Sequence, residues 1–279
     1  MKEKLLLVLK GFVLGIANII PGVSGGTLAI TLGIYEELIG IVSHFFSNIK
    51  KNILFIIPIG IGAVLSILLG SKIINYTLDH YKIATTLFFI GLIIGGIPLI
   101  YKKVKKEKKE AKHIITFLIT FFFIIGLTFL KSGENTISLE TINITMIITL
   151  FLVGGLAAAT MIIPGISGSF VLMLLGFYEP ITETIASLTD FSLLTHNIMI
   201  LAPFGIGIGI GIILIAKIIE YLLKKHEEFT YYAILGFIFS SIISLIMSFS
   251  GMTTNLIEII IGAVLFIVGS IIGYKLGGE

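Results

Sequence analysis

Long runs of apolar residues, separated by short polar segments, recur along the whole chain. Each run is long enough to cross a hydrocarbon core roughly 30 Å thick at about 1.5 Å per helical residue. Because the backbone must satisfy its own hydrogen bonds in lipid, we predict helices rather than strands. The uninterrupted runs cover residues 53–71, 83–101, 113–130, 198–216, 231–247 and 256–274.

Two further apolar regions, residues 5–42 and 144–178, are interrupted by closely spaced proline and glycine. Proline keeps the residue before it out of the helical conformation, and glycine permits backbone angles that other residues avoid. Each region therefore predicts a broken helical hairpin, which either re-enters on one side of the membrane or spans it fully. The fold class that follows is an all-α polytopic membrane protein.

The two broken regions belong to an internal duplication. Blocks of the first half match blocks of the second in the same order, first at an offset of 143 residues and then at 145. An ordered series of matches predicts two related units, residues 1–133 and 134–279, each a broken hairpin followed by three spans. The matched blocks are Pro21–Thr27 with Pro164–Phe170, Leu32–Glu36 with Leu175–Glu179, Pro58–Gly62 with Pro203–Gly207, Lys72–Tyr76 with Lys217–Tyr221, and Gly91–Ile93 with Gly236–Ile238.

The positions of the lysines predict how the chain crosses the membrane, since cytoplasmic loops collect basic residues. Residues 102–112 are rich in lysine and are placed inside, whereas residues 179–197 have none and are placed outside. Counting crossings from these loops puts both termini in the cytoplasm. Each unit then crosses an odd number of times, so the units lie upside down relative to each other, as in the inverted repeats of secondary transporters.

Composition supports a membrane protein and excludes several kinds of chemistry. The chain is 56% hydrophobic with a mean hydropathy of +1.12, more than a soluble domain of 279 residues can bury. It has no cysteine, and all 19 basic residues are lysine, so thiol chemistry and bidentate arginine capture of a phosphate are not available. The N-terminal segment lacks a small-x-small cleavage site and is expected to be retained.

The two breaks are the candidate binding site. Irregular backbone at membrane depth is tolerated only where protein or a water-filled cavity surrounds it, and the N-terminus of the following helix favours an anion. Since the breaks enter from opposite faces, we predict one central anion site. The alternative is that each Pro-Gly pair only kinks a helix. The predicted binding residues are Pro21, Gly22, Ser24, Gly25, Gly26, Thr27, Pro164, Gly165, Ser167, Gly168 and Ser169.

Two matched pairs of charged residues extend this site. Lys72 and Lys217 either attract an anionic head group at each face or snorkel to the interface, as lysines at span ends commonly do. Glu36 and Glu179 each follow a tyrosine and are either coupling sites for a proton or sodium ion or ordinary interfacial carboxylates. The histidines show no ligand spacing, so we expect no metal, and nothing indicates a cofactor or a nucleic-acid partner.

The doubled Pro-Gly-x-Ser-Gly element, with Gly-x-Tyr-Glu about eleven residues beyond each Pro-Gly, resembles a family of prokaryotic membrane proteins. This family, formerly a domain of unknown function, is assigned as polyprenyl-phosphate (undecaprenyl-phosphate) transporters. The resemblance covers essentially the whole chain and is most specific at Pro21–Thr27. In the second copy Ser169 and Phe170 replace Gly26 and Thr27, so a hydroxyl role for Thr27 has no strict partner.

The resemblance implies translocation of the lipid carrier phosphate from the outer to the inner leaflet, for recycling in the synthesis of cell-envelope polymers. The phosphate head group would lie on the helix N-termini at the breaks, with the isoprenoid tail among membrane lipids. One alternative is a transporter or channel for a small soluble anion or other solute, which needs aqueous vestibules instead of a lateral opening. A lipid-phosphate phosphatase is disfavoured, because such enzymes generally use arginine and a nucleophilic histidine. We therefore expect a transporter rather than an enzyme, in an oligomeric state that the sequence leaves open.

Overall fold

The structure is a computed structural model that describes residues 2–19, 23–104, 111–129, 137–139, 141–249 and 256–278. Every regular element within these residues is helical, as the apolar runs predict. The elements in chain order are α1 (Lys2–Ile19), α2 (Gly25–Thr31), α3 (Tyr35–Ser43), the 3₁₀ helix η1 (Phe45–Asn48), α4 (Ile49–Leu65), the π-helical turn η2 (Ser66–Gly70), α5 (Ser71–His80), α6 (Lys82–Val104), α7 (Ala111–Thr128), α8 (Ile144–Ile162), α9 (Gly168–Leu174), α10 (Tyr178–Ala186), the 3₁₀ helix η3 (Ser187–Thr189), α11 (Leu194–Lys225), α12 (Glu227–Met247) and α13 (Leu256–Gly278).

Among the described residues, seven helical segments are long and apolar enough to cross a membrane. They are α4 with η1, α6, α7, α8, α11, α12 and α13, and they include a helix for every uninterrupted apolar run. Large apolar side chains such as Phe122, Leu214 and Ile260 are exposed on their outer faces. Water would oppose so much exposed apolar surface, so these faces are the ones expected to contact lipid.

The order of elements is the same in both halves. The helices α1, α2 and α3 correspond to α8, α9 and α10, and the stretch from α4 to α5 corresponds to the single helix α11. The backbone repeats as well, since Ser24 before α2 has φ −89° and ψ 126° and Ser167 before α9 has φ −90° and ψ 127°. Gly33 and Gly176 follow α2 and α9 with positive φ angles of 69° and 74°. The similarity between the halves therefore extends from the sequence to the backbone.

Repeat-related helices are buried to similar degrees. The most apolar stretches of α6 and α12 are 67% and 56% buried, against 11–22% in α4, α7, α11 and α13. Helix α6 packs closely on α13 and α12 packs closely on α7, since a β-carbon at Gly91 would overlap the carbonyl of Phe266 and one at Gly236 would overlap Thr120. Each half thus contributes one central helix and one outer helix that covers the central helix of the other half.

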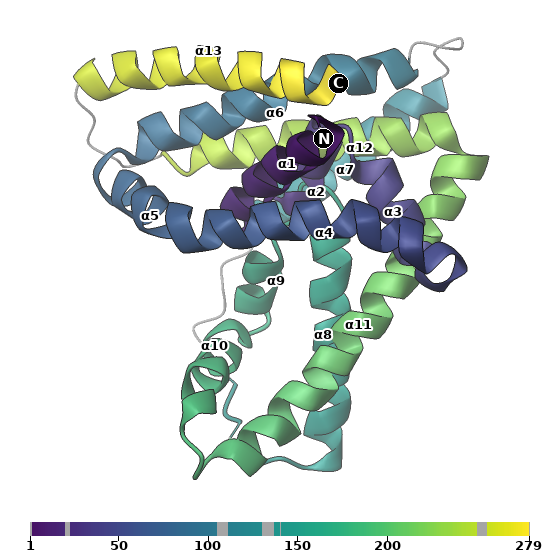
Figure 1. Cartoon of the computed structure of the whole chain (residues 1–279), viewed down its shortest axis with the longest axis vertical. Coiled ribbons are helices and arrows are strands. Elements are labelled where there is room, and N and C mark those ends of the chain that lie inside the picture. Colours follow the sequence, from purple (N-terminus) through teal and green to yellow (C-terminus); the bar gives the residue numbers. More distant parts are fainter. Residues whose placement is uncertain are drawn as a thin grey trace.

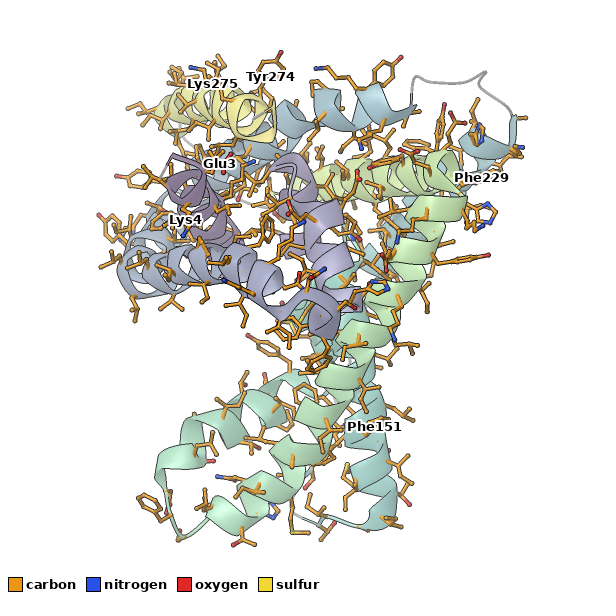
Figure 2. All side chains as sticks on the ribbon, turned by 45° about the vertical axis from the view of Figure 1, so that its right-hand side comes forward. Glu3, Lys4, Phe151, Phe229, Tyr274 and Lys275 are labelled. Atoms are coloured by element: carbon orange, nitrogen blue, oxygen red, sulfur yellow. The ribbon has the colours of Figure 1, made fainter. Side chains whose placement is uncertain are left out.

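The central helices run in opposite directions (Figure 1). The ammonium of Lys103, near the end of α6, lies 5.8 Å from the ring centre of Tyr231, near the start of α12. The beginning of α1 and the end of α13 both lie in the upper part of the molecule, where Lys4 and Lys275 are labelled (Figure 2). The lysine pattern places the end of α6, the start of α12 and both termini on one side of the membrane, and the contact between Lys103 and Tyr231 agrees with this for the two central helices.

The helices α8, α9 and α10 and the first half of α11 project from the remaining helices as an arm (Figure 1). The arm, which includes Phe151 of α8 (Figure 2), runs across the direction of α6, α12 and α13. The first hairpin lies within the body instead, where α2 contacts α6 and α3 contacts α11. The apolar helices do not all share one direction, so their length and composition are what make them candidate spans.

The returning part of each predicted hairpin is itself interrupted. After the break near Pro21, the region predicted as a hairpin over residues 5–42 returns as two helices, α2 and α3, whose axes are inclined by 118°. The turn is a glycine C-cap, in which the N–H of Gly33 bonds to the carbonyl of Ile30 and that of Ile34 to Ala29. The second half repeats this turn at Gly176, so the returning helix predicted to reach Tyr178 ends at Leu174 instead. Residues 179–197, predicted as a loop, contain most of α10 together with η3.

Candidate functional site

The first break separates the end of α1 at Ile19 from the start of α2. Pro21 and Gly22 lie outside the described residues. Ser24 caps α2, since its Oγ accepts a hydrogen bond from the backbone N–H of Thr27 at 3.5 Å. Ser24 is 2% exposed and Thr27 is fully buried, so the two hydroxyls predicted for binding lie inside the protein.

The two breaks contact each other directly. The backbone N–H of Gly165 donates to Thr27 Oγ1 at 2.8 Å, and the hydroxyl of Tyr35 donates to the carbonyl of Ile162 at 3.1 Å. A β-carbon on Gly26 would lie 2.8 Å from that same carbonyl. Glycine at position 26 therefore allows α2 to lie against the second break, and a hydroxyl at position 27 fastens it there. The structure brings the two predicted halves of the site together.

The second break differs from the first in what its hydroxyls do. Ser167 has the backbone conformation of Ser24 but makes no capping hydrogen bond, and its Oγ lies 2.9 Å from that of Ser169. Both serines line a cavity of about 240 Å³ that also borders Gly165. The replacement of Gly26 and Thr27 by Ser169 and Phe170 in the second copy has a structural reason: the first pair packs against the other break, whereas the second pair lines the cavity.

The rest of this hydroxyl-lined cavity is lined by residues of α7 and α12 that were not among the predicted binding residues. Its hydroxyl-bearing residues outside the break are Thr128, Ser241, Ser244 and Ser248. The signal available in the sequence was the spacing of the three serines of α12, which are three and four residues apart and so share one face of an apolar helix. Within the described residues, no lysine, histidine or carboxylate lines this cavity.

A second cavity of about 630 Å³ borders the other side of the same break, at Ile163 and Pro164. Its lining is almost entirely apolar and comes mainly from α11 and α12. On α12 it continues the face of the hydroxyl-lined cavity, because Ala233, Phe237 and Ser241 follow one another at helical spacing. One face of α12 therefore passes from an apolar cavity to a hydroxyl-lined one, with the second break between them.

The predicted charged residues are not at the breaks. Lys217 is exposed on α11 and makes no ion pair with any described residue, and Lys72 lies in α5 with its side chain outside the described part of the structure. Glu36 accepts hydrogen bonds from Lys103 Nζ at 2.9 Å and from the hydroxyl of Tyr231. Glu179 is exposed and lines a separate open cavity of about 460 Å³.

The chemistry that this arrangement offers is hydrogen bonding rather than metal or dipole chemistry. Within the described part of the chain, no group of three His, Asp or Glu side chains is placed to hold a metal ion. The helices after the breaks have only seven residues each, so their dipoles are smaller than the longer predicted helices would give. Hydroxyls and backbone N–H groups are what the second break presents to a ligand.

Comparison with known families shows to which family the chain belongs. The family model VCA0040-like, described as undecaprenyl phosphate translocase-like, matches residues 14–259, from within α1 to within α13. The chain belongs to this family. The resemblance drawn from the doubled Pro-Gly-x-Ser-Gly element is thereby confirmed, and the match takes in both breaks and both central helices.

Two curated relatives are similar to the chain over most of its length. A protein of Staphylococcus aureus (strain NCTC 8325 / PS 47) is 35% identical over 276 residues, which cover 97% of this chain and 95% of the relative. A protein of Vibrio cholerae serotype O1 (strain ATCC 39315 / El Tor Inaba N16961) is 30% identical over 236 residues, which cover 80% and 71%. Both relatives are named polyprenyl-phosphate transporter. No solved structure matches the chain.

Proposed function

We propose that this protein moves a polyprenyl phosphate, such as undecaprenyl phosphate, between the leaflets of the cytoplasmic membrane and so returns the carrier for cell-envelope synthesis. The family and the names of its two relatives support this class of substrate. The observation that carries the proposal is a pair of cavities lined by neighbouring residues of the second break, an apolar one at Pro164 and a hydroxyl-lined one at Gly165. An amphiphile with a small polar head and a long apolar tail matches that pair.

In this proposal the phosphate lies in the hydroxyl-lined cavity beside Gly165, Ser167 and Ser169. Hydroxyl and N–H groups hold an oxyanion by hydrogen bonds, without the additional attraction of a cation. A site of neutral donors binds a phosphate less tightly than a cluster of lysines would. Weaker binding suits a transporter, which must release its substrate on the far side.

The apolar cavity beside Ile163 and Pro164 takes the first isoprenoid units of the tail. At about 630 Å³ it holds only part of a long prenyl chain, so the remainder extends into the surrounding lipid. A small soluble anion would make no use of this cavity. Its position next to the break is the reason to favour a lipid phosphate over a soluble anion.

The arrangement of the two halves supports alternating exposure of this site. The central helices α6 and α12 are repeat-related and run in opposite directions, as an inverted repeat requires. The hydrogen bond from Gly165 to Thr27 joins the two breaks across the halves. Rocking of one half against the other would move the break past its partner and expose the head group to one side at a time. No bond of the substrate needs to be broken.

A leaflet-resolved flip assay tests the proposed function. Purified protein in proteoliposomes should move a fluorescent prenyl phosphate from one leaflet to the other, and should leave the corresponding prenyl alcohol where it is. The assay should be run with and without proton and sodium gradients, because Glu36 and Glu179 remain candidate coupling sites. Uptake of inorganic phosphate without transfer of the lipid would overturn the proposal in favour of a soluble anion. Release of inorganic phosphate from the lipid would indicate an enzyme.

A further inference from the structure

Ser241 lines the hydroxyl-lined cavity and differs from neighbouring serines in its hydrogen bonding. Ser240 on α12 donates to the carbonyl of Phe237 at 2.8 Å, and Ser248, the C-cap residue of α12, donates to that of Leu245 at 2.7 Å. Ser241 is 2% exposed, yet its Oγ has no hydrogen-bond partner among the described residues. Buried hydroxyls in proteins nearly always have a partner, because leaving one unmade is costly. An orphan hydroxyl beside a cavity indicates that a ligand supplies the missing bond.

The position in the first half that corresponds to Ser241 has a different residue and a different packing. At the offset of 145 residues, Ser241 corresponds to Gly96 on α6. There α2 lies directly against α6, and a β-carbon on Gly96 would be 2.5 Å from the Cα of Thr31. The interface that is closed in the first half is therefore open in the second. The second half has a serine where the closed interface requires a glycine.

The other hydroxyls leave few free donors in the cavity. Thr128 donates to the carbonyl of Ile124 at 3.0 Å and lies 2.9 Å from Ser244, so the hydrogen of Ser244 is directed to Thr128. Ser167 and Ser169 bond to each other, which leaves one hydrogen between them. The free O–H groups are therefore that of Ser241 and one of the serine pair of the second break.

The free donors and the lack of charge favour an oxyanion as the ligand. Among the described residues no carboxylate lines the cavity, and a carboxylate is the group that commonly holds a bound cation. Its volume of 240 Å³ corresponds to about eight water molecules at roughly 30 Å³ each, enough for a phosphate group and its nearest carbons. Hydroxyl donors from α12 and from the second break suit the terminal oxygens of such a group.

We infer that Ser241 on α12 binds the phosphate of the lipid substrate together with Ser167 and Ser169 of the second break. The inference rests on the proposed function and deepens it, because it adds a residue of a central helix to a site so far assigned to the breaks. The head group then touches both the second hairpin and α12. Any movement of the hairpin relative to α12 during transport would change the binding of the phosphate directly.

Ser241→Ala and Ser240→Ala are a matched pair for testing this inference. Both serines are buried neighbours on α12, but Ser240 already has a partner on its own helix. Binding of a short-chain prenyl phosphate and of the matching prenyl alcohol should be measured on the full-length protein in detergent. Ser241→Ala should weaken binding of the phosphate about tenfold, the loss expected for one hydrogen bond to a charged group, and leave binding of the alcohol unchanged. Ser240→Ala should bind both ligands as the wild type does.

The thermal stability of the ligand-free protein gives a second, independent readout. Ser241→Ala removes a buried hydroxyl that has no partner, so its midpoint of unfolding should rise by about 2–4 °C. A serine with a purely structural role would lower the midpoint when removed. The unfolding midpoint of Ser240→Ala, which loses an internal hydrogen bond, should not rise.

The possible failures are distinguishable. If the wild type binds the prenyl phosphate and Ser241→Ala binds it equally well, the inference about Ser241 is wrong and the proposed function stands. If the wild type binds neither lipid, the proposed function itself fails. If sodium stabilises the wild type and Ser241→Ala removes that effect without weakening phosphate binding, the cavity is a cation site and the inference is overturned.

Discussion

At the scale of single residues, Thr27 joins the two halves with one side chain. Its side chain is fully buried, and its Oγ1 accepts a hydrogen bond from the N–H of Gly165, which is half-buried and borders the hydroxyl-lined cavity. Thr27→Val keeps the shape of the side chain but leaves that N–H without a partner, at a cost of about 1–3 kcal/mol. We expect a lower unfolding midpoint and slower lipid transfer, measured by thermal unfolding in detergent and by the flip assay.

Thr31→Val is the control for this prediction. Thr31 is equally buried on the same helix, but its hydroxyl only donates to the carbonyl of Thr27 within α2. Its loss should cost less, about 1 kcal/mol or below, since that carbonyl also has other possible donors. If the two variants are equally destabilised, the contact between the breaks is not what Thr27 contributes.

Another prediction concerns the steric fit of Gly26 at the contact between the two breaks. A methyl group there would meet backbone atoms of the second break, with Ile162 O at 2.8 Å and the Cα of Pro164 at 3.3 Å. Since backbone does not yield as a flexible side chain does, Gly26→Ala should separate the breaks and destabilise the protein by about 1–3 kcal/mol. Gly60→Ala is the control, because a β-carbon there meets no atom within 4 Å. Unfolding midpoints should fall for the first variant and hold or rise for the second.

At the scale of elements, the sequence predicts helices well and their interruptions less well. Apolar runs long enough to span a membrane yield helices, because satisfying the backbone in lipid leaves few other solutions. The ends of α6, α7, α12 and α13 lie within four residues of the prediction, whereas α11 continues nine residues beyond the predicted end at 216 and α4 ends at Leu65 instead of 71. The turns at Gly33 and Gly176 were missed, since a glycine in an apolar run reads equally as a helix interior or as a C-cap. Only the packed structure shows which applies.

The candidate site was predictable in position but incomplete in content. The doubled motif pointed to the breaks, and the structure brings them into contact. The serines of α12 were not found, because a hydroxyl on an apolar helix usually bonds to its own backbone and carries no functional signal. What distinguishes Ser241 from Ser240 is the absence of that bond, and this depends on the rotamer and the neighbouring helices rather than on residue type.

The contact of α3 with both central helices supports a prediction about Glu36. Its carboxylate bonds to Lys103 on α6 and Tyr231 on α12, whereas its repeat partner Glu179 is exposed in the arm. The side chains of Glu36 and Lys103 are 52% and 37% exposed, so solvent screens the pair. A double-mutant cycle of Glu36→Gln and Lys103→Gln should give a coupling of about 0.5–1 kcal/mol in unfolding free energy.

The flip assay separates the two interpretations of Glu36. If Glu36 only ties α3 to the body, Glu36→Gln and Lys103→Gln should slow transfer alike and keep any response to proton or sodium gradients. Loss of the gradient response in Glu36→Gln alone would make it a coupling site. Glu37→Gln, at an exposed neighbouring position, is the control and should match the wild type.

At the scale of the whole molecule, the duplication and the asymmetry have to be considered together. The repeat-related starts of α2 and α9 share backbone angles, the spans that follow the hairpins are buried to similar degrees, and the central helices run in opposite directions. The hairpins are nevertheless placed differently, one closed against α6 and the other facing a cavity on α12. The same interface is therefore closed in one half and open in the other. An inverted repeat that exposes a central site to each side of the membrane in turn requires such a difference between its halves.

The proposed inverted arrangement makes a prediction about sidedness, which is simple to test because the chain has no cysteine. Because the natural chain contains no cysteine, each introduced cysteine is the only thiol in the protein. Phe191 is 84% exposed at the tip of the arm, and Lys102 is exposed near the end of α6. In intact cells a membrane-impermeant maleimide should label Phe191→Cys and should label Lys102→Cys only after the membrane is opened, since the lysine-rich side faces the cytoplasm. Lys4→Cys and Lys275→Cys should behave as Lys102→Cys does, because the lysine pattern places both termini in the cytoplasm as well. Labelling of Lys102→Cys and Phe191→Cys from the same side would contradict the inverted repeat, and with it the alternating exposure of the second break.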